Sequence, residues 1–512
     1  MCSEYPRFQD RQESYMQNNI IQNYNERQEV YSISLRRSKR EEFAYKRRQT
    51  STNENTEVPF IITGMVVCLP RIVKIQEQLK ENCSDGIKKK ALEMFKAIIM
   101  NPEIGKEIIK YSIENGLVLD ILGFVNSSFT EKLVAEAVSC LSVICYSGNE
   151  FIEYLKRNDA IAKLIGIIDY SRELATEQAL YALGNISGEA DYYRDILISL
   201  DFLSIVLNLI EKCQNNPQST LLEVSLWNLG NLVRWRPIPF ELGKQTASIA
   251  KKFFFSPSEK VVAEALRIFL SLSNGSDELI SEIFPLNVIE DIMNYLNSPI
   301  EDIHFLAVKI IGNLATGDDG QVQKLLDLGL LGRLLNLSFI ASPNTKQNIM
   351  WILGNITCGS HLQRQQVLDH TIFNFIMQGI IDPSQKVRLE ASFAINHIVH
   401  NGNDEQALAV IDRGFFRYVK DALRFNDPDF LYNIIEFCQG ALGAGDDRAE
   451  DLGTKNMTAV EFNETGCLDV LEKLQDHNNG DIYKKVVFII TTYFGIAENV
   501  PPLDMGPGVA FS

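Results

Sequence analysis

Hydrophobic residues in the segment 222–234 are spaced as in an amphipathic helix. The i, i+4, i+7, i+11 series that predicts its core-facing side consists of Leu222, Leu226, Leu229 and Val233. Trp227 and Asn231 are four residues apart and share the opposite face. An aromatic ring beside an amide on an outward face suits contact with another molecule. The segment therefore predicts a helix that packs with one face and binds with the other.

This element recurs along the chain. Its copies are YALGN (Tyr181–Asn185), KIIGN (Lys309–Asn313), WILGN (Trp351–Asn355) and FAINH (Phe393–His397). Two weaker copies pair Cys140 with Ile144 and Arg267 with Ser271. The step of roughly 42 residues lies in the range of HEAT and armadillo repeats. Because strand patterns are scarce, the sequence predicts an all-α superhelical solenoid.

Glycine follows the end of several predicted helices. The positions are Gly148, Gly188, Gly275, Gly317, Gly359 and Gly402. A glycine just past a helix favours a left-handed C-terminal cap, which we expect at each position. The repeats begin near residue 58. This predicts a basic segment with a hinge at 1–57, the solenoid at 58–495 and a flexible tail at 496–512.

The formal net charge of −17 is unevenly distributed. Residues 1–50 hold ten Lys/Arg against seven Asp/Glu, which leaves −20 for the rest of the chain. An acidic body favours basic partners and disfavours nucleic acid. The run LRRSKREEFAYKRRQT at residues 35–50 has three interpretations: an arm for nucleic acid, a nuclear localisation-like signal, or a basic helix that docks on an acidic protein.

Other sequence features argue against catalysis and metal binding. Nine scattered cysteines without a Cys-x-x-Cys pair predict reduced thiols. His397 and His400 are one helical turn apart, but no third ligand is nearby, so we expect neither a metal nor a cofactor. The glycines of Gly440–Gly445 resemble part of a phosphate loop without its lysine, which favours a turn. We expect that the protein is not an enzyme and, without a signal peptide or spanning segment, that it is in the cytosol or nucleus.

The recurring aromatic and amide residues have a definite use in peptide binding. Neighbouring helices lie about 8–10 Å apart, so rings on successive repeats form slots for the stems of Lys or Arg. Each slot contributes about 1–2 kcal/mol through burial and cation–π attraction. The amide can hold a peptide backbone, and carboxylates after the helices (Glu189, Asp318, Asp319, Glu405) can take the charged heads. The alternative is that the aromatics are core residues and the asparagines simply end helices.

The sequence resembles importin-alpha, the armadillo-repeat adaptor of nuclear import. The resemblance rests on EQALYALGNISG (177–188), LWNLGNLVRWRPIP (226–239), AVKIIGNLATGDDGQVQ (307–323) and WILGNITCG (351–359). It covers nearly the whole chain, since residues 35–49 look like the end of the family's importin-beta-binding segment. The resemblance implies a right-handed superhelical solenoid of about ten armadillo repeats.

The resemblance also implies two cargo-binding grooves for Lys/Arg-rich nuclear localisation signals. The major groove would contain Gly148, Tyr181, Asn185, Glu189, Trp227, Asn231 and Arg234. The minor groove would contain Lys309, Asn313, Asp319, Trp351, Asn355, Phe393, His397 and Glu405. Cys140 and Ile144 stand where the family has Trp and Asn, and Arg267 in place of a Trp would project a positive charge into the array.

Partners follow from the same resemblance. An importin-beta-like carrier would bind Arg36, Arg37, Lys39 and Arg40. The cluster Lys46, Arg47 and Arg48 would occupy the cargo groove as an autoinhibitor until the carrier removes it. An exportin-type receptor would dock near residues 466–485, and the protein would shuttle between cytoplasm and nucleus. A structural armadillo scaffold for a non-nuclear protein partner is the alternative function, and direct nucleic-acid or membrane binding is not expected.

Overall fold

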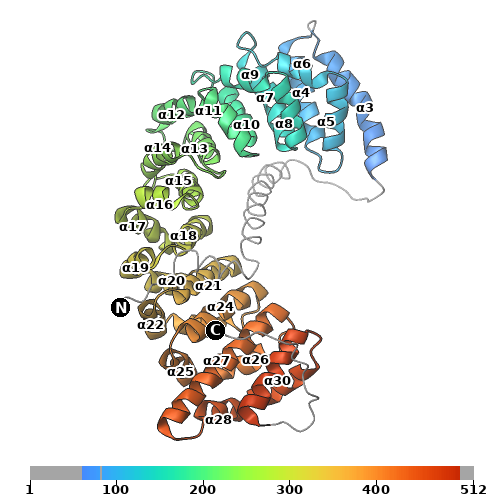
Figure 1. The fold of residues 1–512 in the computed structure, drawn as a ribbon. Coiled ribbons are helices and arrows are strands. Elements are labelled where there is room, and N and C mark those ends of the chain that lie inside the picture. Colours follow the sequence, from blue (N-terminus) through green and yellow to red (C-terminus); the bar gives the residue numbers. More distant parts are fainter. Residues whose placement is uncertain (1–59, 81–82, 496–512) are drawn as a thin grey trace, which may run out of the picture. The chain divides into compact units, whose positions relative to one another are not determined.

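The computed structural model describes residues 60–80 and 83–495. These residues form helices joined by turns, with no strand among them, so the all-α prediction is confirmed (Figure 1). The helices run from Phe60 to Phe494. The predicted carrier-binding residues Arg36, Arg37, Lys39 and Arg40 and the predicted autoinhibitory residues Lys46, Arg47 and Arg48 lie outside the described residues, as does the predicted tail. The boundaries at 57 and 495 stay predictions.

The chain divides into two compact units, residues 1–288 and 289–512. The helices of unit 1 are α3 (Phe60–Gln78), α4 (Asp85–Ile99), α5 (Gly105–Glu114), α6 (Leu117–Gly123), α7 (Glu131–Tyr146), α8 (Asn149–Arg157), α9 (Ala160–Gly166), α10 (Glu173–Ser187), α11 (Asp191–Ser199), α12 (Phe202–Cys213), α13 (Thr220–Leu232), α14 (Phe240–Lys251), α15 (Glu259–Leu272) and α16 (Asp277–Ile283). Helix α17 (Leu286–Asn294) contains the division.

Unit 2 repeats the same helical pattern. Its elements are η1 (Tyr295–Asn297), α18 (Glu301–Leu314), α19 (Asp319–Asp327), α20 (Leu330–Ser338), α21 (Pro343–Cys358), α22 (His361–Asp369), α23 (Phe373–Gly379), α24 (Gln385–Asn401), α25 (Asp404–Asp412), α26 (Phe416–Ala422), α27 (Pro428–Leu452), α28 (Met457–Glu464), α29 (Cys467–Lys473), η2 (Leu474–Asp476) and α30 (Gly480–Phe494).

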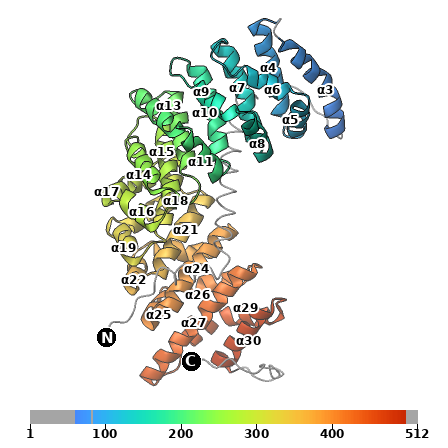
Figure 2. The ribbon, with the colours of Figure 1, turned by 45° about the horizontal axis from the view of Figure 1, so that its top comes forward.

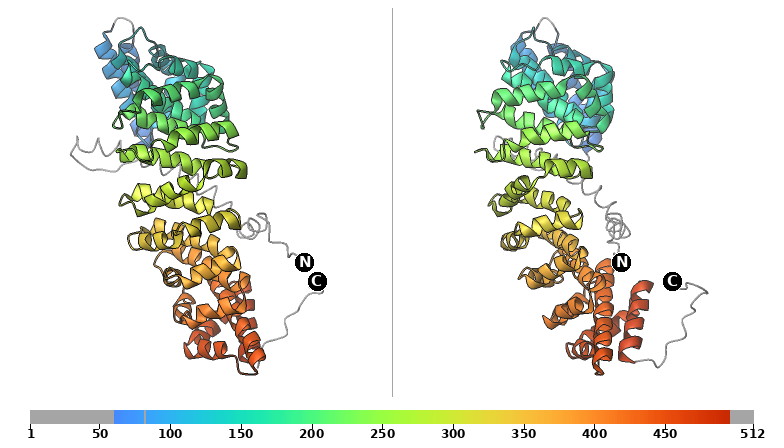
Figure 3. Two further views of the ribbon diagram at one scale, coloured as in Figure 1. Left: turned by 90° about the vertical axis from the view of Figure 1, so that its left-hand side faces the viewer. Right: turned by 60° about the vertical axis from the view of Figure 1, so that its left-hand side comes forward.

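The longest helix of each repeat packs against its equivalent in the next repeat. In unit 1 the series is α4, α7, α10, α13 and α15, and in unit 2 it is α18, α21, α24, α27 and α30. Figures 1 and 2 show these helices side by side within each unit, and Figure 3 shows the layers edge-on. The predicted core face is confirmed, since Leu222, Leu226, Leu229 and Val233 are each fully buried.

The glycines after these helices serve a purpose other than the predicted one. The left-handed caps expected at the six positions are absent: only Gly148 has a positive φ, of 149°, and its ψ of 164° is extended and not left-handed helical. In unit 2 these glycines instead leave room for a glutamine of the following helix. A Cβ at Gly317 would lie 1.9 Å from Oε1 of Gln321, and one at Gly359 would lie 2.0 Å from Oε1 of Gln363. Each glutamine completes a capping box at the start of α19 or α22.

The glycine-rich run Gly440–Gly445 is not a turn, contrary to the sequence prediction, because it lies inside α27. Its glycines allow neighbouring elements to approach closely. A Cβ at Gly440 would lie 2.5 Å from Cγ1 of Val399, and one at Gly445 would lie 2.5 Å from Oδ1 of Asn456. Tertiary packing therefore outweighs the low helix propensity of glycine here.

Two further observations bear on the chemistry of the described region. Its eight cysteines are all free, and burial raises the pKa of Cys145 to about 12 and that of Cys467 to about 11, so both are inert thiols at neutral pH. Within residues 60–80 and 83–495 no helix is both long and apolar enough to cross a membrane.

Candidate peptide-binding rows

Two residues per repeat define the candidate site, and we call them the aromatic position and the amide position. In unit 1 they are Tyr181 with Asn185 on α10 and Trp227 with Asn231 on α13. In unit 2 they are Lys309 with Asn313 on α18, Trp351 with Asn355 on α21, and Phe393 with His397 on α24. The side chains at the aromatic positions are all partly exposed. The structure therefore brings the predicted residues together as one row in each unit.

The tryptophan of each row lies against a glycine of the preceding helix. In unit 1 a Cβ added to Gly184 would come within 2.1 Å of Cζ3 of Trp227. Tyr181, on the same helix as Gly184, places its ring centroid 6.0 Å from that of Trp227 with the ring planes tilted by 53°. Only a glycine at this position lets the indole reach across the helix, so Gly184 fixes the orientation of Trp227.

The arrangement is the same in unit 2. A Cβ added to Gly312 of α18 would come within 2.2 Å of Cζ3 of Trp351. Gly312 is the third residue after Lys309, just as Gly184 is the third residue after Tyr181. The same contact occurs in both units, so the position of the tryptophan against a glycine of the preceding helix is a property of the repeat.

The amide positions are more deeply buried than the two-face interpretation predicted. Asn231 is 6% exposed, and Asn313 and Asn355 are each 7% exposed. Asn231 donates from Nδ2 to the carbonyl of Gly184 at 3.0 Å, and Asn185 donates from Nδ2 to the carbonyl of Ser142 at 3.2 Å. These amides are braced by the preceding helix, and Nδ2 of Asn185 also donates to Oγ of Ser142 at 3.3 Å.

The hydrogen bonds also correct the assignment of the weak repeat on α7. Since Gly184 follows the aromatic position Tyr181 by three residues, the acceptor Ser142 places the aromatic position of α7 at Ser139 and not at Cys140. Cys140 is fully buried and contacts the carbonyl of Leu92 at 3.4 Å. The predicted Ile144 is fully buried too, and the partly exposed residue at the amide position is Val143. Because α7 is apolar on most sides, its hydrophobic pattern could not fix this one-residue difference.

Arg267 occupies the aromatic position of α15 and is partly exposed, and its positive charge is accompanied by a carboxylate that the sequence prediction did not include. Its Nη1 atom lies 2.9 Å from Oε1 of Glu264, one turn earlier in the helix. The Arg267 side chain is 18% exposed and that of Glu264 is 3% exposed. The buried carboxylate of Glu264 balances the charge of the guanidinium, so the aromatic position of α15 carries a polar ion pair without net charge.

Carboxylates line the first turns of α10 and α13. Burial raises the pKa of Glu177, and repulsion from Glu173 and Glu223 adds to the effect. Lys260 lies 3.7 Å from Glu223 on the α13 side. Carboxylates that repel one another gain from a nearby cation, and Lys260 of α15 supplies one here.

The remaining predicted residues of the major groove lie at the ends of the α7, α10 and α13 helices. Gly148 precedes α8, and Glu189 follows α10 and is partly exposed. The guanidinium of Arg234 lies 5.5 Å from the ring centroid of Trp235. The pKa of Tyr193 is raised mainly by burial, then by Glu153, and to a smaller extent by the nearby charge of Glu189.

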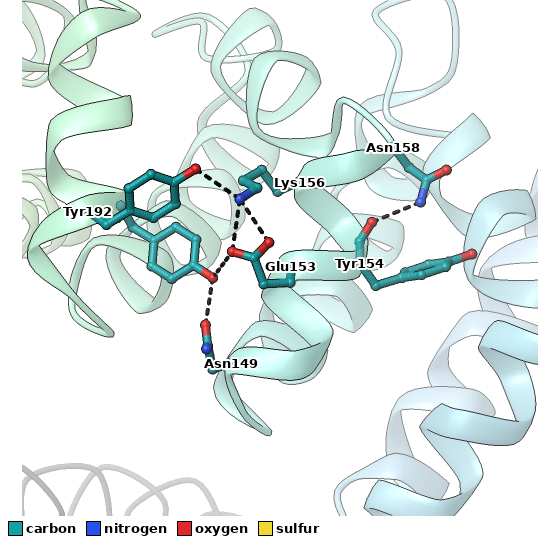
Figure 4. A network of polar contacts seen from close by, with 7 residues as sticks. Asn149, Glu153, Tyr154, Lys156, Asn158 and Tyr192 are labelled. Atoms are coloured by element: carbon teal, nitrogen blue, oxygen red, sulfur yellow. Dashed lines mark hydrogen bonds and ion pairs between the residues drawn. The ribbon is translucent and has the colours of Figure 1, made fainter.

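A polar network anchors α8, the helix that follows Gly148 (Figure 4). The Tyr193 hydroxyl of α11 lies 2.5 Å from Oδ1 of Asn149 and 2.6 Å from Oε1 of Glu153. Lys156 lies 2.8 Å from Oε2 of Glu153 and donates to the Tyr192 hydroxyl at 3.0 Å. These contacts hold α8 against α11 and so fix the backbone next to Gly148.

The predicted carboxylates of the minor groove lie in the first turns of two helices. Asp319 begins α19, and its carbonyl accepts a hydrogen bond from Nε2 of Gln363 at 2.8 Å. Glu405 lies in the first turn of α25 and is exposed. Both lie just after the helix that carries an amide position, as predicted.

His397 replaces asparagine at the amide position of α24. Its Nδ1 atom lies 2.9 Å from the carbonyl of Gly354. A carbonyl only accepts, so Nδ1 carries the hydrogen and Nε2 of the neutral ring is an acceptor. Burial, together with the nearby Arg364 and His400, lowers the pKa of His397 to about 4, although the hydrogen bond to Gly354 acts in the opposite direction. The ring is therefore neutral at physiological pH.

We expect the lowered pKa of His397 to make the stability of the protein depend on acidity. The unfolded chain takes up the proton near the ordinary value of 6.5, whereas the folded chain takes it up only near 4. The stability that His397 provides is complete above about pH 6.5 and is lost as the pH falls toward 4. In the variant His397→Asn, the free energy of unfolding should fall less between pH 7 and pH 4 than it does in the natural protein, as urea denaturation at a series of pH values would measure. Parallel profiles would contradict this.

Sequence reasoning missed two residues at aromatic positions. The residue directly after each aromatic position is fully buried, as Ile352 and Ala394 show, and Phe437 of α27 and Val486 of α30 are buried in the same way. This places Glu436 and Lys485 at the aromatic positions of α27 and α30. Their charged side chains hid them from a search for aromatic residues, although the regular burial of the next residue gives a detectable signal.

Metal binding gains no support from the part of the chain that is described. Across residues 60–80 and 83–495 no group of three or more His, Cys, Asp or Glu side chains is arranged to hold an ion.

The fold and the rows together define a helical solenoid of armadillo type. A family model described as "Atypical Arm repeat" matches residues 456–507. An engineered protein of known crystal structure shares the fold with a TM-score of 0.65 and 18% identity, over 81% of this chain and 97% of that one.

Known proteins that resemble the sequence are importin alpha subunits. Importin subunit alpha-6 of Arabidopsis thaliana is 26% identical over 51% of this chain and 49% of its own length. Importin subunit alpha-B of Dictyostelium discoideum is 28% identical over 53% of this chain and 52% of its own length. The chain spans about half the length of the curated relatives it matches. These similarities support an importin-alpha-like armadillo protein.

Proposed function

We propose that this protein is a nuclear import adaptor that binds Lys/Arg-rich nuclear localisation signals along the aromatic and amide positions. The observation that carries the proposal is the pair of tryptophans, since Trp227 lies against Gly184 and Trp351 lies against Gly312 of the preceding helix. The similarity to importin alpha subunits supports it. The adaptor function requires no catalysis and no cofactor.

Each row supplies the groups that an extended basic peptide requires. Rings held against a glycine flank the stem of a lysine or arginine, and the braced amides present hydrogen-bonding groups to a peptide backbone. Carboxylates at Glu189 or Asp319 and Glu405 attract the charged heads. Since the body of the chain is acidic, this attraction falls as salt is added.

The remaining partners of the adaptor would bind at two other segments, the N-terminal basic segment and residues 466–485. An importin-beta-like carrier binds Arg36, Arg37, Lys39 and Arg40, and an exportin-type receptor docks near residues 466–485. The adaptor then shuttles between cytoplasm and nucleus, with no direct role for nucleic acid or membranes.

The test is a titration of the full chain with a fluorescent peptide of Lys-Lys-x-Lys type, beside an acidic peptide and a scrambled one. Micromolar or tighter binding that weakens with salt supports the adaptor. Equal affinity for the acidic peptide would reject it.

Autoinhibition gives a prediction of its own. Replacing Lys46, Arg47 and Arg48 together by alanine should tighten binding of the basic peptide about tenfold or more when no carrier is present, because a tethered competitor acts at high effective concentration. Alanines at Arg7 and Arg11 change the charge of the same region and serve as the control. Unchanged affinity of the triple variant would remove autoinhibition from the proposal.

The second candidate function is a structural armadillo scaffold for a protein that is not nuclear. Ser139, Arg267 and Glu436 at aromatic positions favour it, because they interrupt both rows with residues that give a lysine stem no ring. The same titration separates the two functions, since a scaffold of this kind has no preference for basic peptides.

A further inference from the structure

The unit 2 row ends in two charged residues that face each other. Glu436 holds the aromatic position of α27, and Lys485 holds that of α30. The two form an ion pair, with side chains that are 21% and 24% exposed, respectively. An ion pair at these positions replaces the rings found on α21 and α24.

The ammonium of Lys485 is held by three groups of α27. Besides Glu436, the Nζ atom lies 3.4 Å from Oε1 of Gln439 and 5.1 Å from the ring centroid of Tyr432. Burial lowers the pKa of Lys485, so the ammonium has lost part of its water shell, as it does in a binding site. An aromatic ring, a carboxylate and an amide oxygen are the groups that bind a lysine side chain.

Glu436 is itself positioned from a third helix. His400 of α24 places Nε2 3.5 Å from Oε2 of Glu436. Gly440 allows this approach, because a Cβ there would lie 3.3 Å from Cε1 of His400. Burial and the charge of Lys485 both lower the pKa of His400, so the imidazole is neutral and does not compete with the lysine.

We infer that Tyr432, Glu436 and Gln439 form a lysine-binding site, and that Lys485 of the same chain fills it and thereby ends the row. This inference deepens the proposed function, and its peptide-binding consequence rests on that function. Successive helices are about 8–10 Å apart and an extended peptide advances about 3.3 Å per residue. Opening the site should therefore extend the row by about three peptide residues.

The first experiment does not depend on peptide binding. In the full chain, Lys485→Ala should lower the Tm by on the order of 2 °C. Butylammonium, which reproduces the lysine stem and head, should restore the Tm when compared with sodium chloride at the same ionic strength. The double variant Lys485→Ala/Glu436→Gln should not respond. An equal response of the two variants, or no response, would overturn the lysine site.

The second experiment tests the extension of the row. Two peptides of Lys-Lys-x-Lys type each carry three additional residues with a terminal lysine, one at the amino end and one at the carboxyl end. Lys485→Ala should bind one of them about two- to fivefold more tightly than the natural chain does, with no gain for the unextended peptide. Rescue by butylammonium without this gain would overturn the claim that the site continues the row.

Failure of the proposed function can be recognised separately. If neither the natural chain nor the variant binds any basic peptide while butylammonium still restores the Tm, the adaptor proposal falls and the lysine site remains.

Discussion

Trp227→Ala and Trp351→Ala should each weaken the binding of a basic peptide that uses that row by about 5- to 30-fold. The estimate corresponds to the loss of one slot that contributes about 1–2 kcal/mol through burial of a lysine stem and cation–π attraction. Both indoles are partly exposed, so removal of either should leave the fold intact. Fluorescence anisotropy with a labelled peptide measures the affinity, and circular dichroism checks the fold.

Two further variants separate the ring from its support. Trp227→Phe keeps an aromatic face and should retain most of the affinity. Gly184→Ala keeps every aromatic residue, but its Cβ would lie 2.1 Å from the indole, so Trp227 must move. Binding should therefore weaken, as it does in Trp227→Ala. Binding that is insensitive to Trp227→Ala and Trp351→Ala would place the peptide elsewhere.

Phe269→Ala should destabilise unit 1 by about 3–5 kcal/mol, the cost of truncating a large buried aromatic residue. Phe269 of α15 is 1% exposed. Its ring centroid lies 4.9 Å from that of Phe254 and 5.5 Å from that of Phe284, so the cavity would open at the centre of an aromatic cluster. The urea midpoint of unfolding, followed by circular dichroism, measures the loss.

The chain supplies a control next to that cluster. Phe255 neighbours Phe254 in sequence but is 75% exposed, so Phe255→Ala removes a similar side chain without leaving a cavity. Its free energy of unfolding should stay within about 0.5 kcal/mol of that of the natural protein. If Phe269→Ala and Phe255→Ala unfold at the same denaturant concentration, the cluster does not stabilise unit 1 as we expect.

Some features of the candidate site could be predicted from periodicity alone. The pairing of Trp227 with Asn231 and of Trp351 with Asn355 follows from a spacing of four residues, which places two side chains on one helix face whatever the surroundings. The buried leucines around Trp227 follow from the same geometry. These positions depend on the helix itself, so the sequence was sufficient.

Other features depend on which helix lies next to which. Ser139, and not Cys140, holds the aromatic position of α7 because the hydrogen bond from Asn185 to Ser142 sets the register between two helices. An apolar helix offers several acceptable faces to its neighbours, and its own sequence does not choose among them. By contrast, the ion pair of Arg267 with Glu264 lies within α15, three residues apart, and the sequence prediction of a positive charge at this position did not include it.

The sequence by itself determined the all-α class, the repeat length and most of the residues at the aromatic and amide positions, because these follow from the geometry of a single helix. Only the tertiary structure decided that each tryptophan lies on a glycine of the preceding helix and that Lys485 lies against Glu436. Such contacts join residues about forty or more positions apart in the sequence. Their formation depends on the packing of neighbouring helices, which no local pattern specifies.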